Sequence, residues 1–439
     1  MAATTEPGPA AFPVPPLAAR LFDLARAEGY EARIVGGAVR DWLAGLPIGD
    51  IDMAVAAPID AFADACRADG IRVIETGLSH GTVTVLSPAR PGGGNPDAAN
   101  SDSANAGIGG PIEVTQTRVD LETDGRHAVV GFSDDWKADA SRRDFTINAI
   151  YIDADGQIDD PLGGRADLES GTLRFAGNAA QRVEEDALRM LRYCRFLPRF
   201  GSAGIDPAAA AALRDAAPTA ARLSGERVAA ECRRLFGMDD GVAGIHLLQD
   251  TGIAAHALGT ALEPGHLAHL ADKAGFDAGI DPHQAWLVRL AALTAPGRAP
   301  VLAQRLRLSR QDSRLLAGLD SGDPAQTAAL LNGPDWQQGA YVMVRDQLPP
   351  AALLVVAAAR CGRTADPDHL AMLASWMPPE FPLAAADLLS HGVDKGPRLG
   401  EMLRAAEAHW VGEDFAPSRQ DLIDFAMTSD DQYGSATIE

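Results

Sequence analysis

The chain has 439 residues, 46% hydrophobic and 5% aromatic, which favours two or three helix-rich globular domains over β-sandwiches. Its four cysteines lack paired or metal-ligand spacing, which argues against a disulfide framework and a structural zinc site. The formal net charge of −22 argues at first against a nucleic-acid partner. The charge is uneven, however. Residues 182–199 hold five arginines against three acids, so the global balance can conceal a local basic track.

No segment of the sequence predicts contact with a membrane. The first residues, MAATTEPGPAAFPVPP, contain no charged stretch followed by an apolar core, and no apolar run approaches the length of a spanning helix. We therefore expect a cytoplasmic protein without a membrane anchor, in the reducing setting that the scattered cysteines favour.

Hydrophobic periodicity predicts an α+β chain, with a mixed region of about 150 residues followed by a long all-α region. Residues 121–140 carry few apolar anchors and predict a mobile loop, and residues 141–152 have a helix-like pattern. The low-complexity insert at 88–111 is interpreted as a loop between strands. We expect helices at 17–28, 38–46 and 59–70, and strands at 31–37, 50–55, 71–76, 81–87 and 112–118.

Two aspartates lie one residue apart in the predicted strand DIDMAV. Because side chains alternate along a strand, Asp50 and Asp52 point to the same side, while Ile51 and Met53 point into the core. Two steps of about 3.3 Å place the carboxylates roughly 6–7 Å apart, close enough to share metal ions. Aligned carboxylates repel without a cation, and Mg²⁺ prefers a few carboxylates combined with phosphate oxygens. The pair therefore favours a magnesium site for a phosphate-bearing substrate.

A third acid is expected from the strand IEVTQTR, where Glu113 shares the polar face with Thr115 and Thr117. If this strand lies beside DIDMAV, three carboxylates line one patch, as two-metal phosphoryl transfer requires. An isolated D-x-D pattern is far more often an ordinary solvated strand face, so the pattern needs independent support.

That support comes from Gly36 and Gly37, which lie between a predicted strand and a predicted helix. Free backbone N–H groups at such a turn attract phosphate, and only a turn without side chains allows a close approach. Arg40, one turn into the helix, can reach the same anion. A lone glycine pair is usually an ordinary βα turn, but here D-x-D follows ten residues after the arginine.

Five motifs occur in order and together resemble the class II tRNA nucleotidyltransferases and bacterial poly(A) polymerases. They are GGAVRDWLAGLPIGDIDMAV (36–55), RRDFTINAIYI (142–152), DPLGGRADL (160–168), EEDALRMLRYCRF (184–196) and LSGERVAAE (223–231). The segment GPRLGEMLRAAEAHW, at 396–410, is also similar to bacterial members.

The resemblance implies a polymerase-β-like nucleotidyltransferase head with a mixed β-sheet at 1–155, which includes the insert. It further implies a helical neck for nucleobase recognition at 156–245 and an all-α, tRNA-binding body and tail at 246–439. Asp50 and Asp52 would hold Mg²⁺, and Glu113 would help activate the terminal 3′-hydroxyl. The implied nucleotide-binding residues are Gly36, Gly37, Arg40, Arg143, Asp144, Asn148, Asp186, Arg189, Arg192 and Arg195.

The resemblance also implies particular roles for these residues. Gly37 and Arg40 would contact the triphosphate, Arg143 with Asp144 would contact the phosphate or ribose, and Asp144 with Asn148 would sense the 2′-hydroxyl.

One continuous helix from Val183 is expected to carry the residues that recognise the base. Asp186 and Arg189 would present an acceptor and a donor to the Watson–Crick edge, a task that suits a planar guanidinium. Arg192 and Arg195 would serve the triphosphate or brace this pair. Ordinary helix-surface salt bridges to Glu184 and Glu185 also explain the pattern, and Glu226 and Glu231 are expected to support the helix.

The expected activity is template-independent addition of CMP and AMP, from CTP and ATP, to the 3′ end of tRNA. The alternatives are a poly(A) polymerase of the same family and a tRNA nucleotidyltransferase that adds only CC or only A. Beyond these, a catalytically inactive RNA-binding protein would lack the acids, all of which are present. A nucleotidyltransferase acting on a small molecule would not need the long helical region.

Overall fold

The computed structural model describes residues 11–77, 81–87, 110–123, 128–270 and 280–434. Almost all of the insert at 88–111 therefore lies outside the described residues. The chain divides into two compact units, one comprising 1–231 with 243–257 and the other comprising 232–242 with 258–439. Each unit is described by itself below.

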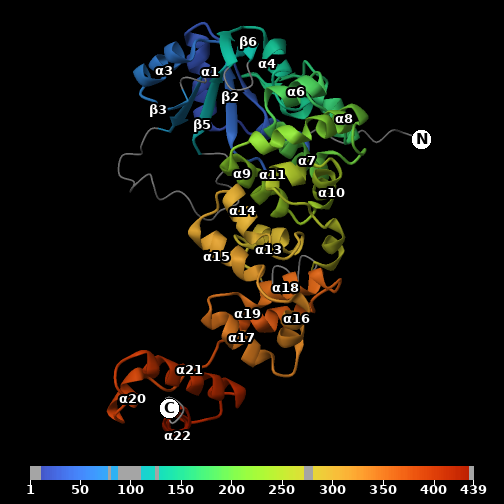
Figure 1. Ribbon diagram of the computed structural model, residues 1–439. Helices are drawn as coiled ribbons and strands as arrows, with labels where there is room; N and C mark the ends of the chain where they lie inside the picture. The colour runs from blue at the N-terminus through green and yellow to red at the C-terminus, as the bar shows by residue number, and fades with distance from the viewer. Residues whose placement is uncertain (1–10, 78–80, 88–109, 124–127, 271–279, 435–439) are drawn as a thin grey trace, which may run out of the picture. The chain divides into compact units, whose positions relative to one another are not determined.

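The first unit is built on a seven-stranded sheet with the strand order β3-β4-β5-β2-β1-β8-β9 (Figure 1). Strands β2 and β5 pair in parallel and the other neighbours pair antiparallel, so the sheet is mixed and the predicted α+β class is confirmed. The strands are β1 (Ala32–Val35), β2 (Ile51–Val55), β3 (Arg72–Gly77), β4 (Thr82–Leu86), β5 (Ile112–Gln116), β8 (Tyr151–Ile152) and β9 (Ile158–Asp159).

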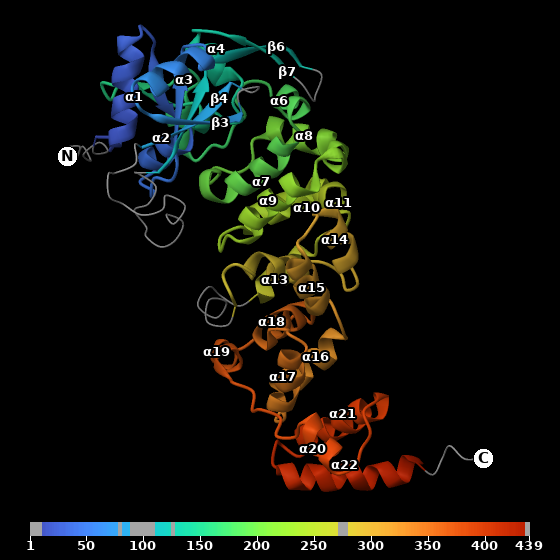
Figure 2. The ribbon, with the colours of Figure 1, turned by 90° about the vertical axis from the view of Figure 1, so that its left-hand side faces the viewer.

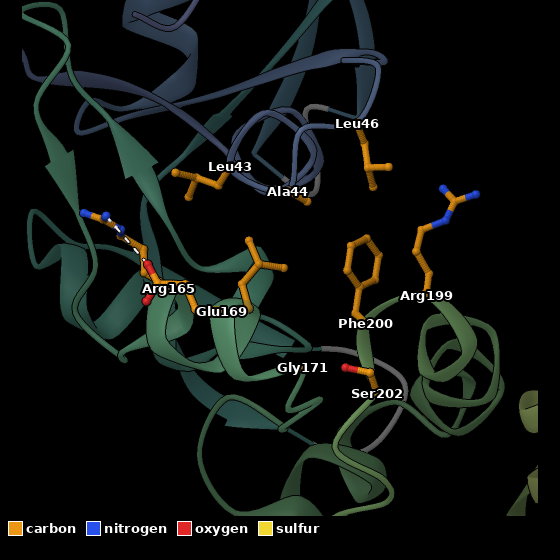
Figure 3. Close-up of a pocket in the computed structure, with 10 residues that line it drawn as sticks. Leu43, Ala44, Leu46, Arg165, Glu169, Gly171, Arg199, Phe200 and Ser202 are labelled. Atoms are coloured by element: carbon orange, nitrogen blue, oxygen red, sulfur yellow. Dashed lines mark ion pairs between the residues drawn. The ribbon is translucent and has the colours of Figure 1, made fainter. Parts of the chain in front are cut away.

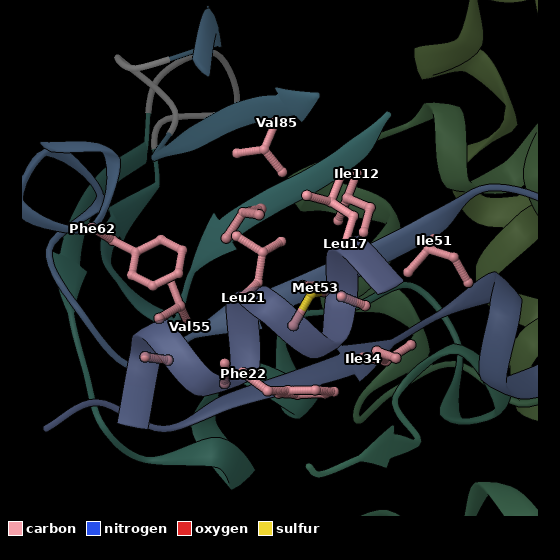
Figure 4. Packing of buried hydrophobic residues seen from close by; sticks show 14 of the residues in the cluster. Leu17, Leu21, Phe22, Ile34, Ile51, Met53, Val55, Phe62, Val85 and Ile112 are labelled. Atoms are coloured by element: carbon pink, nitrogen blue, oxygen red, sulfur yellow. The ribbon is translucent and has the colours of Figure 1, made fainter. Parts of the chain in front are cut away.

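Helices α1 (Pro16–Ala27) and α3 (Ile59–Ala68) pack against each other and against the sheet. The side chains between helices and sheet form the main core of this unit (Figure 4), and alternate residues of β2 contribute Ile51, Met53 and Val55 to it. Burial of one face of β2 fixes the strand's orientation, because a slip by one residue would turn every apolar side chain to the opposite face. The polar side chain of β2 is therefore held on the other face.

The expectation of a loop at 121–140 is wrong. Strands β6 (Arg118–Thr123) and β7 (Ala128–Phe132) form a two-stranded antiparallel sheet, and helix α4 (Trp136–Ser141) follows. Asp135 begins that helix by accepting hydrogen bonds from the N–H groups of Lys137 and Ala138. This N-cap is a local start signal, and the apolar run AVVGF of β7 is a local strand signal that the polar residues on either side of it obscure.

The helix-like pattern at 141–152 also does not form a helix. Only a short 3₁₀ turn, η4 (Thr146–Asn148), separates α4 from β8. Phe145 instead forms a β-bridge with Phe175, and the Thr146 N–H donates to the Arg174 carbonyl. Residues 145–152 are all buried, so the segment is surrounded by protein on all sides and its apolar residues do not define a helical face.

The predicted helix from Val183 through Arg195 is interrupted. Helix α6 ends at Glu185, Asp186 adopts an extended conformation, and helix α7 begins at Leu188. Aromatic packing of Tyr193 against Phe145 and Phe175 anchors α7. Figure 2 shows α7 among the helices that follow it. The remaining helix between the strands of the sheet is α2 (Gly37–Leu43). The helices that follow the sheet are α5 (Gly164–Ser170), α6 (Ala179–Glu185), α7 (Leu188–Phe200), α8 (Pro207–Ala216), η5 (Ala217–Arg222), α9 (Gly225–Phe236), α10 (Val242–Asp250) and α11 (Ile253–Leu258).

The second unit is all-α among its described residues, as expected for the C-terminal half. Its elements are η6 (Pro264–His269), α13 (Ala285–Ala292), α14 (Ala299–Arg305), α15 (Arg310–Leu319), α16 (Pro324–Asn332), α17 (Trp336–Arg345), α18 (Pro350–Arg360), α19 (Pro367–Ser375), α20 (Ala385–Ser390), α21 (Pro397–Gly412) and α22 (Arg419–Gly434). Residues 350–359 of α18 are buried on all sides, as an all-round apolar helix requires. No single helix of the described chain is long and apolar enough to cross a membrane, and α17 with α18 meets that test only as a pair bent by 113°.

Candidate functional site

Two carboxylates lie opposite each other on neighbouring parallel strands. The register of β2 and β5 pairs Asp52 with Glu113, while the flanking Ile51 pairs with Ile112 in the core. Asp50 lies just before β2 and is exposed. The strand pairing expected from the sequence is thus present, and we call Asp50, Asp52 and Glu113 the carboxylate patch.

The closeness of the acids in the carboxylate patch disfavours ionisation of Asp52. Burial and the neighbouring Glu113 carboxylate raise the pKa of Asp52 to about 6, with a smaller contribution from Asp50, whereas Arg143 acts in the opposite direction. No three His, Cys, Asp or Glu side chains converge as a ready-made metal site in the described parts of the chain. Carboxylate oxygens that repel one another are nonetheless the donor type that hard divalent cations prefer.

A glycine turn lies beside the patch. Gly36 has a φ of +82°, and a Cβ atom added to it would lie 3.8 Å from Asp52 Oδ2. The turn therefore combines a backbone conformation that favours glycine with close access to the acid. Gly37 begins α2, and a Cβ atom there would lie 3.6 Å from Arg40 Nη2.

Arg40 is more deeply buried than its expected contact with the triphosphate suggests. Its Nε donates to Asp41 at 2.8 Å and its Nη1 to Asn148 at 2.6 Å, and its guanidinium lies over the rings of Phe196 and Phe200. These contacts join the glycine turn to α7. Triphosphate contact by Arg40 remains a prediction.

Arg143 and Asp144 form separate ion pairs. Arg143 donates from Nη2 to Asp139 at 2.9 Å and from Nε to the Tyr151 hydroxyl at 3.1 Å. Asp144 accepts hydrogen bonds from Arg192 Nε at 2.8 Å and from Asn148 Nδ2 at 2.9 Å. Burial opposes ionisation of Asp144, but Arg192 and Asn148 hold its pKa below the usual range, so it is a carboxylate at neutral pH.

The expected base-reading pair, Asp186 and Arg189, lies at the junction of α6 and α7. Arg189 donates to Glu185 at 2.7 Å and to the main-chain carbonyl of Arg142 at 2.9 Å. Asp186 is bonded to Arg227 at 2.8 Å. One predicted salt bridge, between Arg189 and Glu185, therefore exists together with contacts that the helical pattern did not indicate.

The last two predicted arginines converge on Glu231 of α9. Arg195 Nε donates to Glu231 at 2.6 Å, and Arg192 Nη1 lies 3.8 Å from the same carboxylate. Glu231 is buried, so its charge needs these partners. It braces α7, as expected.

Three contributors to the site were not predicted from the sequence. Asp139 lies beneath Arg142 and Arg143, Arg227 pairs with Asp186, and Arg182 donates to the Ser141 carbonyl. Asp139 precedes the two arginines by three and four residues, a spacing that brings charges together on a helix. This spacing in the sequence could have predicted the ion pairs of Asp139 with Arg142 and Arg143.

The first unit also contains a pocket of about 350 Å³ that is distinct from the carboxylate patch. Figure 3 shows Leu43, Phe200 and Arg199 around it, with Arg165 and Glu169 at one side. None of the predicted site residues lines this pocket. The chemistry of the acids, rather than cavity size, therefore defines the candidate site.

Comparisons with known proteins agree with this geometry. A family model described as "Poly A polymerase head domain" matches residues 32–174, and one described as "Probable RNA and SrmB- binding site of polymerase A" matches residues 204–263. The mitochondrial CCA tRNA nucleotidyltransferase 1 of Mus musculus is 30% identical over 409 residues, covering 92% of this chain and 88% of the relative. The CCA-adding enzyme of Lacticaseibacillus paracasei is 32% identical over 398 residues, covering 88% and 89%. The crystal structure of the Bacillus stearothermophilus CCA-adding enzyme in complex with CTP superposes with a TM-score of 0.71 at 25% identity, covering 95% and 98%.

The mixed sheet with its opposed acids and glycine turn defines a nucleotidyltransferase. The similarity to the relatives from Mus musculus and Lacticaseibacillus paracasei extends over most of the chain and is not confined to the residues of the sheet. The chain belongs to the class II CCA tRNA nucleotidyltransferase family. It is an enzyme of that type, and membership implies dependence on a divalent metal ion.

Proposed function

We propose that this enzyme adds CMP and AMP, from CTP and ATP, to the 3′ end of tRNA without a nucleic-acid template. The observation that carries the proposal is the register that sets Asp52 opposite Glu113, beside the turn at Gly36. The full-length similarity to relatives named for CCA addition supports the choice of RNA substrate.

We propose that Asp50 and Asp52 hold Mg²⁺, because their side chains supply carboxylate oxygens at a place where Arg143 offsets the negative charge only in part. When bound, such an ion lowers the pKa of the attacking hydroxyl and stabilises charge on the transferred phosphate. Glu113, opposite Asp52, would orient that 3′-hydroxyl. The absence of a side chain at Gly36, next to Asp52, would let the triphosphate approach the acids.

The remaining predicted residues would position the nucleotide. Arg143 lies close enough to Asp52 to lower its pKa, so its positive charge is available to a phosphate at the same place. Asp144 and Asn148 are hydrogen-bonded to each other and would present polar groups to the ribose. Asp186 and Arg189 would recognise cytosine or adenine, for which Asp186 must exchange Arg227 for the base.

We propose that the chain has three functional parts. The head at 1–155 carries out nucleotidyl transfer, the neck at 156–245 recognises the nucleobase, and the body at 246–439 binds tRNA. One segment of the body supports RNA binding. Residues 298–314 contain five arginines and one acid, against a net charge of −22 for the whole chain. Arg298, Arg310 and Arg314 are exposed and form no ion pair with any residue that the structure describes.

The cellular compartment also remains part of the proposal. The four cysteines lack paired spacing in the sequence, which favours a reducing setting, and we propose the cytoplasm. The relative from Mus musculus is named as mitochondrial, so the family is not restricted to one compartment.

Extension of a tRNA that lacks CCA tests the activity. The enzyme should add three nucleotides from CTP and ATP and then stop, and Asp52→Ala should abolish addition while tRNA binding persists. Undiminished addition by the variant would exclude this assignment of the site. Long A-tails on a generic RNA would instead identify a poly(A) polymerase, and addition that stops after CC, or that supplies only A, would identify a partial enzyme.

A further inference from the structure

Asp139 is a fully buried carboxylate that no expected role accounts for. It lies near the end of α4 with 0% of its surface exposed. Arg142 donates to Oδ1 from Nε at 2.8 Å, Arg143 donates to Oδ2 from Nη2 at 2.9 Å, and the Tyr151 hydroxyl donates to Oδ2 at 2.8 Å. Burial alone would favour its protonation, but Arg143 and Arg142 hold the pKa of Asp139 below the usual range, so the group is charged.

These bonds leave one end of Arg143 unused. Its Nε and Nη2 donate to Asp139, and Nε also contacts the Tyr151 hydroxyl at 3.1 Å. Within the ranges that the structure describes, Nη1 donates to no acceptor. A guanidinium held along one edge in this way presents the other N–H groups in a fixed direction. Arg143 is also close enough to Asp52 to stabilise its ionised form.

The same carboxylate acts indirectly on the base-reading pair. Arg142 is held by Asp139 through its side chain, and its main-chain carbonyl accepts a hydrogen bond from Arg189 Nη2 at 2.9 Å. Fixing Arg142 therefore also fixes an acceptor that orients Arg189. One buried charge thus supports an arginine on the phosphate side of the site and another on the base side.

We propose that Asp139 is a positioning residue for nucleotidyl transfer, which holds Arg143 by one edge so that Nη1 is free to bind a phosphate oxygen of the incoming nucleotide next to Asp52. The inference rests on the proposed function, because it takes the nucleotide to be a triphosphate bound beside the carboxylate patch. Asp139 itself does not touch the substrate.

A purely structural ion cluster predicts a different behaviour. If Asp139 only stabilised α4, its loss would lower thermal stability and leave the properly folded fraction with normal nucleotide affinity. If it positions Arg143, its loss weakens binding of CTP and ATP alike, because the phosphates are common to both. Binding of tRNA that lacks CCA is unaffected in either case.

The test compares Asp139→Asn with Asp135→Asn. Both changes neutralise one aspartate of the same helix, but Asp135 is exposed and only caps the N-terminus of α4. Calorimetric titration of CTP and of ATP, with Mg²⁺ present, measures affinity independently of turnover. We expect Asp139→Asn to weaken both affinities by about tenfold and to raise KM more than it lowers kcat, while Asp135→Asn changes neither. Unchanged affinities in folded Asp139→Asn protein would overturn the proposal.

A double-mutant cycle with Arg143→Ala shows whether the effect passes through Arg143. The double variant should bind nucleotides more tightly than the product of the two single losses predicts, because the part that passes through Arg143 is already lost, whereas fully independent losses would multiply and refute a positioning role. If Asp139→Asn fails to fold, Tyr151→Phe removes one bond to the same carboxylate and one to Arg143 Nε, and it keeps the charges of both residues. It should weaken CTP and ATP binding to a smaller extent, and normal binding by that variant would contradict the proposal. Nucleotide binding without addition to tRNA by the wild-type enzyme would count against the proposed function alone.

Discussion

Asp52 and Glu113 come from strands β2 and β5, and the parallel register places them opposite each other with the apolar residues on either side of them in the core. The Glu113 carboxylate makes ionisation of Asp52 more costly, in addition to the cost that burial already imposes. This relationship links the stability of the free protein to metal binding.

The stability of the metal-free protein should therefore depend on pH in a defined direction. The pKa of Asp52 is raised to about 6 from an ordinary value of 3.8. Asp52 therefore keeps its proton up to a higher pH in the folded state than in the unfolded state. The free energy of unfolding falls as the pH rises between those two pKa values. A divalent cation removes this penalty, so Mg²⁺ should raise Tm more at pH 7.5 than at pH 5. A metal-induced shift in Asp52→Asn that still differs between the two pH values would contradict this account.

Removing the neighbouring acid should separate stability from activity. Glu113→Gln eliminates the repulsion that helps to raise the pKa of Asp52, so the metal-free variant should be more stable at pH 7.5. Its rate of nucleotide addition should nevertheless fall, because the residue proposed to orient the 3′-hydroxyl is lost. Thermal unfolding and primer extension measure the two effects, and a variant that loses stability would argue against repulsion between the acids.

The turn at Gly36 has a matched control in Gly29. Both glycines have a positive φ, +82° and +78°, so alanine should lower the free energy of unfolding at either position, and more at Gly36, whose ψ of −133° lies outside the left-handed helical region. Only at Gly36 does the new Cβ lie beside Asp52, where it would occupy space needed by the triphosphate. We expect Gly36→Ala to raise the KM for CTP and ATP and Gly29→Ala to leave it unchanged. Equal kinetics for the two variants would remove the turn from the site.

The ion pair between Asp186 and Arg227 should compete with the nucleotide base. Both side chains are partly exposed, with 33% and 51% of their surfaces accessible, and such a pair contributes less than about 1 kcal/mol. Arg227→Ala should therefore lower the KM for CTP and ATP by up to about fivefold. Arg222→Ala, which removes another exposed arginine nearby, serves as the control. A higher KM in Arg227→Ala would mean that Arg227 assists binding of the base.

The arginine-rich segment of the body should affect RNA binding alone. Reversing the charges of Arg310 and Arg314 to glutamate should weaken tRNA binding and reduce its dependence on salt, because fewer counterions are released from the RNA. The affinity for CTP should not change. Arg363→Glu reverses an exposed charge elsewhere in the same unit and controls for net charge. Unaltered tRNA affinity at several salt concentrations would exclude this segment from the RNA-binding surface.

The sequence predicted those parts of the site that depend on local alternation. The period of two in DIDMAV placed Asp52 opposite the core residues Ile51 and Met53, and the polar face of the next parallel strand placed Glu113. The motifs specified the family, which the full-length relatives confirm. The roles assigned to the individual nucleotide-binding residues remain predictions.

The features that the sequence did not reveal depend on contacts between distant segments. Asp186 interrupts a strongly helical pattern, and its partner Arg227 lies on another helix. Phe145 pairs with Phe175 instead of continuing a helix. The strands β6 and β7 pair with each other in a segment whose many polar residues predicted a loop. In each case tertiary pairing overrides the local periodicity.

The partition of the acids between β2 and β5 also has a consequence for biosynthesis. A molecule in which Ile112 has not yet docked beside Ile51 holds Glu113 apart from Asp50 and Asp52, so its carboxylate patch is incomplete. If Glu113 orients the 3′-hydroxyl as proposed, nucleotide addition by a newly made chain should begin only when β5 has paired with β2.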